Sequence, residues 1–301
     1  MDYKFLDTDK AVIKYLNDLE ESSINEIGVD FEADFNLHAY GEKLCLIQLY
    51  DGRIPVVIDP MKIDPMITKS FFESRKIAKI MFDSSSDQRL LYKLYKIRIH
   101  NIIDLKPAVN ILQYPKLNLG YLLTEKIGLP PFNKKAFQQY NWLTRPIDKK
   151  AMDYAISDVL YLFELRQMLF NEMAEKGLMI DYLGKNSSMQ ESAPRIDNKH
   201  SIFRKLLYSS LGKTQRKIFQ EIFWIRDKYA KRLDLPPYLL FSNEKIRKLC
   251  TRPETVHNFK TRKEIDILEM EKLRSEIEQV HYKYELEMEQ QFLSKDGKPD
   301  G

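Results

Sequence analysis

Cysteine and long apolar runs are both scarce in this sequence. Cys45 and Cys250 are the only two cysteines among 301 residues, and neither belongs to a CxxC or Cys/His cluster. A disulfide framework or a zinc site is therefore not expected, and a reducing cytoplasm fits best. No stretch approaches the roughly 18 apolar residues of a membrane span, and the first residues lack the basic-then-apolar pattern of a secretory signal. We expect no membrane partner.

Histidine is also rare, and the usual nucleophile arrangements are missing. None of the five histidines lies in a recognisable motif, and nothing resembles a Ser-His-Asp or Cys-His set. Chemistry that depends on a protein nucleophile is therefore not indicated. Acidic residues remain as the candidates.

Positive charge is unevenly distributed along the chain. The segment 203–260 holds fourteen Lys or Arg against five Asp or Glu, an excess of nine, although the whole chain is only +4. The remainder therefore carries −5. This asymmetry is typical of a basic module that attracts phosphate, attached to a domain that uses acidic residues elsewhere. A solvated helical surface is the alternative explanation.

Hydrophobic periodicity predicts an α/β domain followed by a small all-α domain. We expect strands at 27–31, 44–50, 55–58 and 78–82, and helices at 64–73, 86–95 and 148–176. The polar stretch 186–202 is the predicted linker between a first domain, 1–185, and a helical domain, 203–292. In the second domain we expect helices at 213–232, from 243 onward, and from 262 to 292. Residues 293–301 are predicted to be a disordered tail.

Asp30 and Glu32 form the first candidate site. Residues two apart on a strand point to the same face, so the two carboxylates would lie side by side. Adjacent anions repel each other unless a cation lies between them, and divalent cations that prefer oxygen ligands are the usual solution. Taken alone, such a pair is more often two solvated charges than a metal site.

Tyr154, Asp158 and Asp87 are the other candidates. Tyr154 and Asp158 are four residues apart on a predicted helix, which places a phenol and a carboxylate on one face. Asp87 follows a predicted strand, at the point where the next helix begins. A helix N-terminus stabilises an acidic residue at such a position. Each has a structural explanation, a surface pair or a helix cap, and Asp83 could replace Asp87 in either role.

In this order and on these elements, the acidic residues resemble the ribonuclease D family, the D-E-D-D exonucleases with a tyrosine in the third motif. The resemblance extends over about residues 1–180 and includes 41–52, 57–60, 101–104, 117–123 and 141–146. Residues from 214 to about 252 resemble the helical domain shared by RecQ-type helicases and ribonuclease D, known as HRDC.

The resemblance implies a ribonuclease H-like fold, a mixed five-stranded sheet with helices on both faces. It implies a 3′→5′ exoribonuclease that uses two divalent metal ions, Mg²⁺ or Mn²⁺, to release nucleoside monophosphates. Asp30 would bridge both metals, Glu32 and Asp158 would complete one site, and Asp87 would hold the second metal largely through water. Tyr154 would position the attacking water. The implied partner is RNA with a free single-stranded 3′ end, such as a tRNA precursor.

Four further residues are expected near the substrate. Lys135, Gln138 and Trp142 lie in a segment that resembles the loop before the third motif, where basic and aromatic groups contact single strands. Trp142 can also be a core anchor, and Arg145 either a phosphate contact or a structural salt bridge. Phe31, Phe82 and Asp83 depart from the family pattern, which leaves local substrate contacts and metal preference open.

Two alternatives to an RNA-degrading enzyme remain open. A DNA exonuclease would use the same chemistry, since no motif reveals the 2′-hydroxyl contacts that distinguish RNA. A catalytically inactive nucleic-acid adaptor is disfavoured because all five catalytic positions are retained. The sequence does not define an oligomeric state, although a monomer is favoured.

Overall fold

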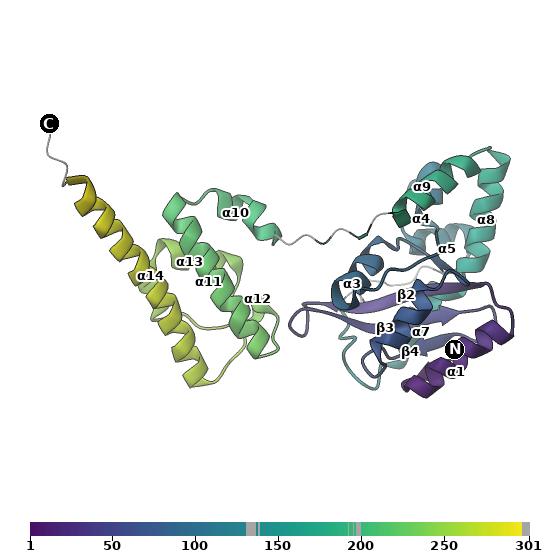
Figure 1. Cartoon of the computed structure of the whole chain (residues 1–301), viewed down its shortest axis with the longest axis horizontal. Helices are drawn as coiled ribbons and strands as arrows, with labels where there is room; N and C mark the ends of the chain where they lie inside the picture. Colours follow the sequence, from purple (N-terminus) through teal and green to yellow (C-terminus); the bar gives the residue numbers. More distant parts are fainter. Residues whose placement is uncertain (131–136, 138, 192, 195, 197–199, 297–301) are drawn as a thin grey trace. The chain divides into compact units, whose positions relative to one another are not determined.

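The chain divides into two compact units in the computed structural model, which describes residues 1–130, 137, 139–191, 193–194, 196 and 200–296. The first unit comprises 1–35 and 42–196, and the second comprises 36–41 together with the residues from 197 onward. Figure 1 shows a sheet with surrounding helices in the first unit and helices alone in the second. None of the described helices is both long and apolar enough to cross a membrane.

A mixed sheet forms the centre of the first unit. Its described strands are β1 Lys4–Leu6, β2 Glu26–Phe35, β3 Glu42–Tyr50, β4 Val56–Ile58, β5 Ala78–Met81 and β6 Ile102–Asp104. They lie in the order β1-β4-β3-β2-β5-β6. Strand β3 is antiparallel to β2 and β4, whereas β5 is parallel to β2 and β6. The residue pattern predicted four of these strands, and the family resemblance implied five. Neither β6 nor β1, which pairs in parallel with β4, was predicted from the residues.

Eight helices are described in the first unit. They are α1 Asp9–Glu21, α2 Pro65–Glu73, α3 Ser85–Tyr95, α4 Lys106–Ile111, α5 Leu119–Ile127, α7 Lys149–Leu160, α8 Leu162–Glu175 and α9 Met179–Glu191. Apolar side chains of α1, α2 and α3 share one buried cluster with Val29 and Phe31 of β2. Side chains of α7 and α8 form separate clusters with other residues of the sheet. The mixed α/β architecture that the sequence predicted is present.

Three predicted boundaries differ from the structure. The single helix expected at 148–176 is two, because the backbone at Tyr161 leaves helical geometry between α7 and α8. The linker expected from 186 begins later, because α9 continues to Glu191. The last helix begins at Ile267 rather than 262, since the Asp266 carboxylate accepts from the N–H of Leu268.

The second unit is helical throughout its regular elements. These are η1 Ser201–Arg204, α10 Leu206–Ser209, α11 Lys213–Arg232, α12 Pro237–Leu240, α13 Asn243–Thr251, η2 Pro253–Val256 and α14 Ile267–Asp296. Helix α14 includes residues 293–296, which were predicted to be disordered; the rest of that predicted tail lies outside the described residues.

Helix α14 packs against α11 through apolar and charged contacts. Leu273 and Ile277 of α14 are fully buried in the same cluster as Phe219 and Ile222 of α11. Acidic residues of α14 also pair with basic residues of α11: the Lys228 ammonium lies 2.5 Å from Glu276, and Arg232 pairs with Glu269. Part of the positive charge counted from the sequence is therefore neutralised within the unit.

Gly28 allows α7 to approach β2 closely. A Cβ added at Gly28 would lie 3.1 Å from the carbonyl oxygen of Val159, tighter than an ordinary van der Waals contact. Glycine inside a strand often marks such an approach of another backbone. Because Asp158 precedes Val159, this contact sets how near its carboxylate comes to β2.

We predict that Gly28→Ala lowers the free energy of unfolding by about 1–3 kcal/mol, because the added methyl group overpacks this contact. Gly184→Ala is the matched control: it lies within α9 with nothing within 4 Å of its added Cβ. Alanine in a helix is favoured over glycine, so the control should gain roughly 0.5–1 kcal/mol. Urea unfolding measures both changes. Equal stability of the two variants would contradict the close approach.

Candidate active site

Strand β2 presents Asp30 and Glu32 on one face. Val29 and Phe31 point into the apolar cluster with α1, α2 and α3, so the alternating acidic residues point to the opposite face. Both acidic residues are half-buried. The strand places the pair as the sequence predicted, side by side and partly shielded from water.

Helix α7 supplies the third carboxylate. The Asp148 side chain caps the start of the helix by accepting from the N–H groups of Lys150, at 2.8 Å, and Ala151, at 3.3 Å. Asp158 is 7% exposed, in the last turn of the helix. Its carboxylate oxygen and those of Asp30 and Glu32 lie within 4.8 Å of one another. Two distant segments therefore converge on one cluster.

The three carboxylates suit a hard divalent cation. Mg²⁺ and Mn²⁺ prefer carboxylate oxygens, and the repulsion among three clustered anions is relieved when a cation lies between them. The donors are all oxygen, and the carboxylates lie close enough together to share one ion. The residues present therefore fit the metal that the sequence implied.

Tyr154 lies beside this cluster. Its ring stacks on Phe137 with centroids 4.9 Å apart and planes 8° from parallel. Burial raises the pKa of the Tyr154 hydroxyl far above its usual range, and the negative charges of Asp158 and Glu32 raise it further. The phenol therefore stays protonated at neutral pH and can donate a hydrogen bond next to the carboxylates.

Asp87 reaches the same region from α3. Burial is the main cause that raises the pKa of its carboxyl group well above the usual value, and the negative charge of Asp30 is the next. Asp83 is placed differently: its side chain is 45% exposed and pairs with Lys106. The structure thus shields Asp87 next to Asp30, whereas Asp83 is held by a lysine.

Asp104 was not among the predicted site residues. Its carboxylate is 1% exposed and accepts from the N–H of Asp83 at 3.0 Å and from the N–H and hydroxyl of Ser84 at 2.8 and 2.7 Å. It thereby holds the turn that leads into α3 and Asp87. The available signal was that Asp104 ends the segment 101–104, which matches the family pattern. For Gly28 the signal was a glycine inside a predicted strand.

The residues predicted to contact substrate divide into two groups. Lys135 and Gln138 lie outside the described residues. Trp142 is 3% exposed and packs in the core with Leu46 and Met152, so its indole is a core anchor rather than a substrate contact.

Arg145 is a structural residue. Its guanidinium donates two hydrogen bonds to the buried carboxylate of Asp59, at 2.8 and 3.0 Å, and three to the carbonyl oxygens of Cys45, Trp142 and Thr144. A guanidinium has five N–H donors. All five donors bind groups within the protein. Of the two predicted roles, the structure therefore shows the structural salt bridge and not the phosphate contact.

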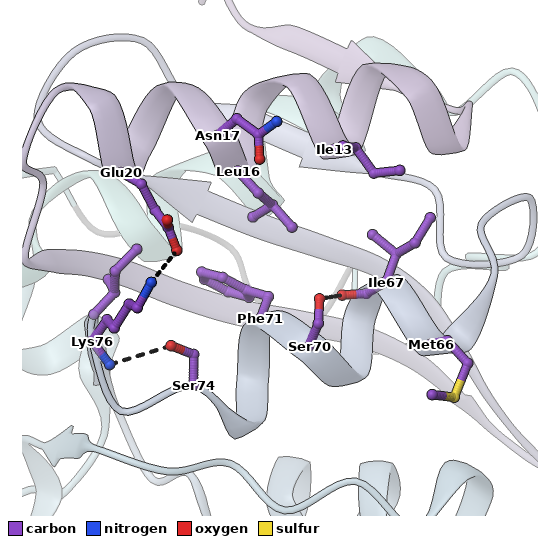
Figure 2. A pocket seen from close by; sticks show the side chains of 11 residues that line it. Ile13, Leu16, Asn17, Glu20, Met66, Ile67, Ser70, Phe71, Ser74 and Lys76 are labelled. Carbon is purple, nitrogen blue, oxygen red and sulfur yellow. Dashed lines mark hydrogen bonds and ion pairs between the residues drawn. The ribbon is translucent and has the colours of Figure 1, made fainter.

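A groove elsewhere on this unit contains none of the candidate residues. It has a volume of about 530 Å³ and lies between α1 and α2, with Leu16 and Phe71 among its lining side chains. Figure 2 shows the Glu20–Lys76 ion pair at its margin. The groove has no carboxylate cluster, so it is separate from the candidate active site.

Comparison with known proteins relates this geometry to a family. The family described as 3′-5′ exonuclease matches residues 3–174. An exosome complex component 10 homolog from Caenorhabditis elegans is 29% identical over 170 residues, which cover 56% of this chain and 18% of that protein. Ribonuclease D from Cronobacter turicensis is 27% identical over 139 residues, 46% of this chain and 37% of that protein. The chain thus spans well under half the length of either relative.

A solved structure shares the fold. The crystal structure of Escherichia coli RNase D, described as an exoribonuclease involved in structured RNA processing, has a TM-score of 0.70 and 21% sequence identity. The alignment covers 93% of this chain and 76% of that structure. The family match covers more than half of the chain, including Asp30, Glu32, Asp87, Tyr154 and Asp158. The chain therefore belongs to the 3′-5′ exonuclease family.

Proposed function

We propose that this protein is a metal-dependent exoribonuclease that shortens RNA from its 3′ end and releases nucleoside monophosphates. The observation that carries the proposal is the convergence of Asp30, Glu32 and Asp158 within 4.8 Å, on a strand and a helix far apart in sequence. Three anions held this close suit a metal site, and Tyr154 adds a proton donor beside it.

In this proposal the acidic residues hold metal ions and Tyr154 orients water. Asp30, Glu32 and Asp158 would hold one divalent ion, and Asp30 and Asp87 would hold a second. When bound, such ions supply the charge that activates water and stabilises the leaving 3′-oxygen. Tyr154 keeps its proton and donates a hydrogen bond that orients the attacking water, while its stack on Phe137 fixes the ring. Gly28 and Asp104 hold α7 and α3 in place.

The relatives support RNA as the substrate class. One is named ribonuclease D, and the related solved structure is described as an exoribonuclease of structured RNA. We propose single-stranded 3′ ends of structured RNA, such as tRNA precursors, as the substrate and the cytoplasm as the compartment. DNA cleavage remains the alternative, because the chemistry at the phosphodiester is the same.

We propose that the helical unit contributes RNA affinity. With α14 included, residues 203–296 contain twenty Lys or Arg against fifteen Asp or Glu, so the excess falls from nine to five. Arg247 and Lys248 of α13 are exposed, whereas Lys228 and Arg232 are paired with acidic residues of α14. The surface of α13 is therefore the better candidate for phosphate contacts.

The central test follows digestion of a 5′-labelled single-stranded RNA with Mg²⁺ or Mn²⁺. We expect stepwise shortening from the 3′ end, mononucleotide release, and no cleavage of a circular RNA. Asp158→Asn should lower the rate by at least about 100-fold while the circular dichroism spectrum stays unchanged, because one metal ligand is lost. Faster digestion of the matched DNA would favour the DNA alternative, and no hydrolysis of either would favour an inactive adaptor.

A second prediction separates Asp87 from Asp83. Asp87→Asn should reduce hydrolysis, whereas Asp83→Asn should keep most of it, because Asp87 lies close enough to Asp30 to interact with its charge and Asp83 pairs with Lys106. The pKa of Asp87 is higher in the folded than in the unfolded protein. The free energy of unfolding of the metal-free protein therefore falls as the pH rises above the usual carboxyl range. Asp87→Asn should therefore raise the metal-free melting temperature at pH 8. An inactive Asp83→Asn with an active Asp87→Asn would show that the second motif is misassigned.

A third prediction concerns the salt dependence of RNA binding. The double variant Arg247→Ala/Lys248→Ala should flatten the slope of log affinity against log salt, by roughly 0.7 for each lost contact on a single strand. Lys228→Ala/Arg232→Ala removes the same charge from residues already paired with Glu276 and Glu269, and should change the slope less. Fluorescence anisotropy with labelled RNA measures both. Equal slopes in both variants and the wild type would rule out α13 as the contact surface.

A further inference from the structure

The outer side of β6 is satisfied by side chains rather than by another strand. β6 ends the sheet order, so the backbone groups of Ile102 and Asp104 that point away from β5 need other partners. Helix α9 supplies them. The N–H of Ile102 donates to the Gln190 side-chain oxygen at 2.9 Å, and the N–H of Asp104 donates to that of Asn186 at 3.1 Å.

The carbonyl groups are satisfied from the same helix. The Ile102 oxygen accepts from the side-chain amides of Asn186, at 2.8 Å, and Gln190, at 3.1 Å. The Asp104 oxygen accepts from the hydroxyl of the buried Tyr182 at 3.1 Å. One helix thus pairs with both N–H groups and both carbonyl oxygens of these two residues that face away from β5.

The spacing explains why a helix can replace a strand here. Tyr182, Asn186 and Gln190 are four residues apart, a rise of about 6.0 Å along a helix. Alternate residues of a strand are about 6.6 Å apart. The two repeats nearly match, so successive side chains of α9 bind first Asp104 and then Ile102. The helix therefore runs antiparallel to the strand.

The side-chain carboxylate of Asp104 contacts the turn before α3. Ser84 precedes α3 but makes no side-chain capping bond. The Asp104 carboxylate instead accepts from the N–H groups of Asp83 and Ser84 and from the Ser84 hydroxyl, which in turn accepts from the Gln88 amide at 2.9 Å. The turn that precedes α3 is therefore held by a carboxylate at the end of β6.

We propose that Asn186 is a positioning residue for Asp87 and acts through Asp104. The Asn186 amide fixes the backbone of Asp104, the Asp104 carboxylate fixes the start of α3, and Asp87 lies in the first turn of that helix. This inference rests on the proposed function, in which Asp87 holds a divalent ion. Loss of the Asn186 amide frees the end of β6 and lets the first turn of α3 move away from Asp30.

The test compares three alanine variants of the 301-residue chain. Asn186→Ala removes the bond to the N–H of Asp104 and one of the two bonds to the Ile102 oxygen. Gln190→Ala removes bonds to Ile102 from the same helix but none to Asp104. Asn171→Ala removes a side-chain amide from the exposed surface of α8, where it accepts from Gln167. Two properties are measured: Mn²⁺ binding by calorimetry without RNA, and hydrogen exchange of the peptide that covers residues 82–90.

We expect the wild-type protein to bind two Mn²⁺ ions with different affinities. Asn186→Ala should raise the dissociation constant of the lower-affinity site by about 10-fold, as for other residues that orient metal ligands. Exchange in 82–90 should be faster in this variant alone. Gln190→Ala and Asn171→Ala should bind Mn²⁺ as the wild type does, although Gln190→Ala lowers the melting temperature. If Asn186→Ala does not fold, Asn186→Leu replaces it, because leucine keeps the volume without the hydrogen bonds.

Three results would overturn the inference. Wild-type Mn²⁺ binding and exchange in Asn186→Ala would show that Asn186 does not position Asp87. Equal weakening in Asn186→Ala and Gln190→Ala would show a general loss of stability instead. Both results leave the proposed function intact. A wild-type protein that binds no Mn²⁺ would overturn the proposed function together with the inference.

Discussion

Negative charge is concentrated where β2, α3 and α7 meet, and much of the first unit serves to hold it there. Asp30, Glu32 and Asp158 converge within 4.8 Å, and desolvation together with the negative charge of Asp30 raises the pKa of Asp87. Such repulsion would push flexible segments apart. It is resisted because each carboxylate lies on a regular element whose position is fixed by close packing at Gly28 or by the side-chain hydrogen bonds of Asp104 and Asp148.

The sequence could predict the parts of the site that depend on local periodicity. The two-residue spacing of Asp30 and Glu32 and the four-residue spacing of Tyr154 and Asp158 fix which side chains share a face. The position of Asp87 at a helix start was also readable. Acidic residues at these spacings occur in many proteins, however, and convergence of the two segments could only be inferred from family resemblance.

Features that depend on distant contacts could not be predicted. Residues 186–191 are polar enough to suggest a linker, yet they are helical because Asn186 and Gln190 bind the backbone of β6. The two possible roles of Arg145 were equally compatible with the sequence until its pairing with Asp59 was seen. The free positive charge of the second unit could not be predicted either. A count of charges along the chain does not reveal which basic residues form ion pairs with the glutamates of α14.

The side-chain pairing along β6 also affects how the protein behaves towards other chains. An open strand at the end of a sheet offers a template on which another chain can add a strand, and this is a common route to aggregation. At β6 the donors and acceptors of Ile102 and Asp104 are already occupied by amide and hydroxyl groups of α9. At the opposite edge β1 is only three residues long. The sheet of the folded protein therefore gives an incoming strand little to pair with on either side.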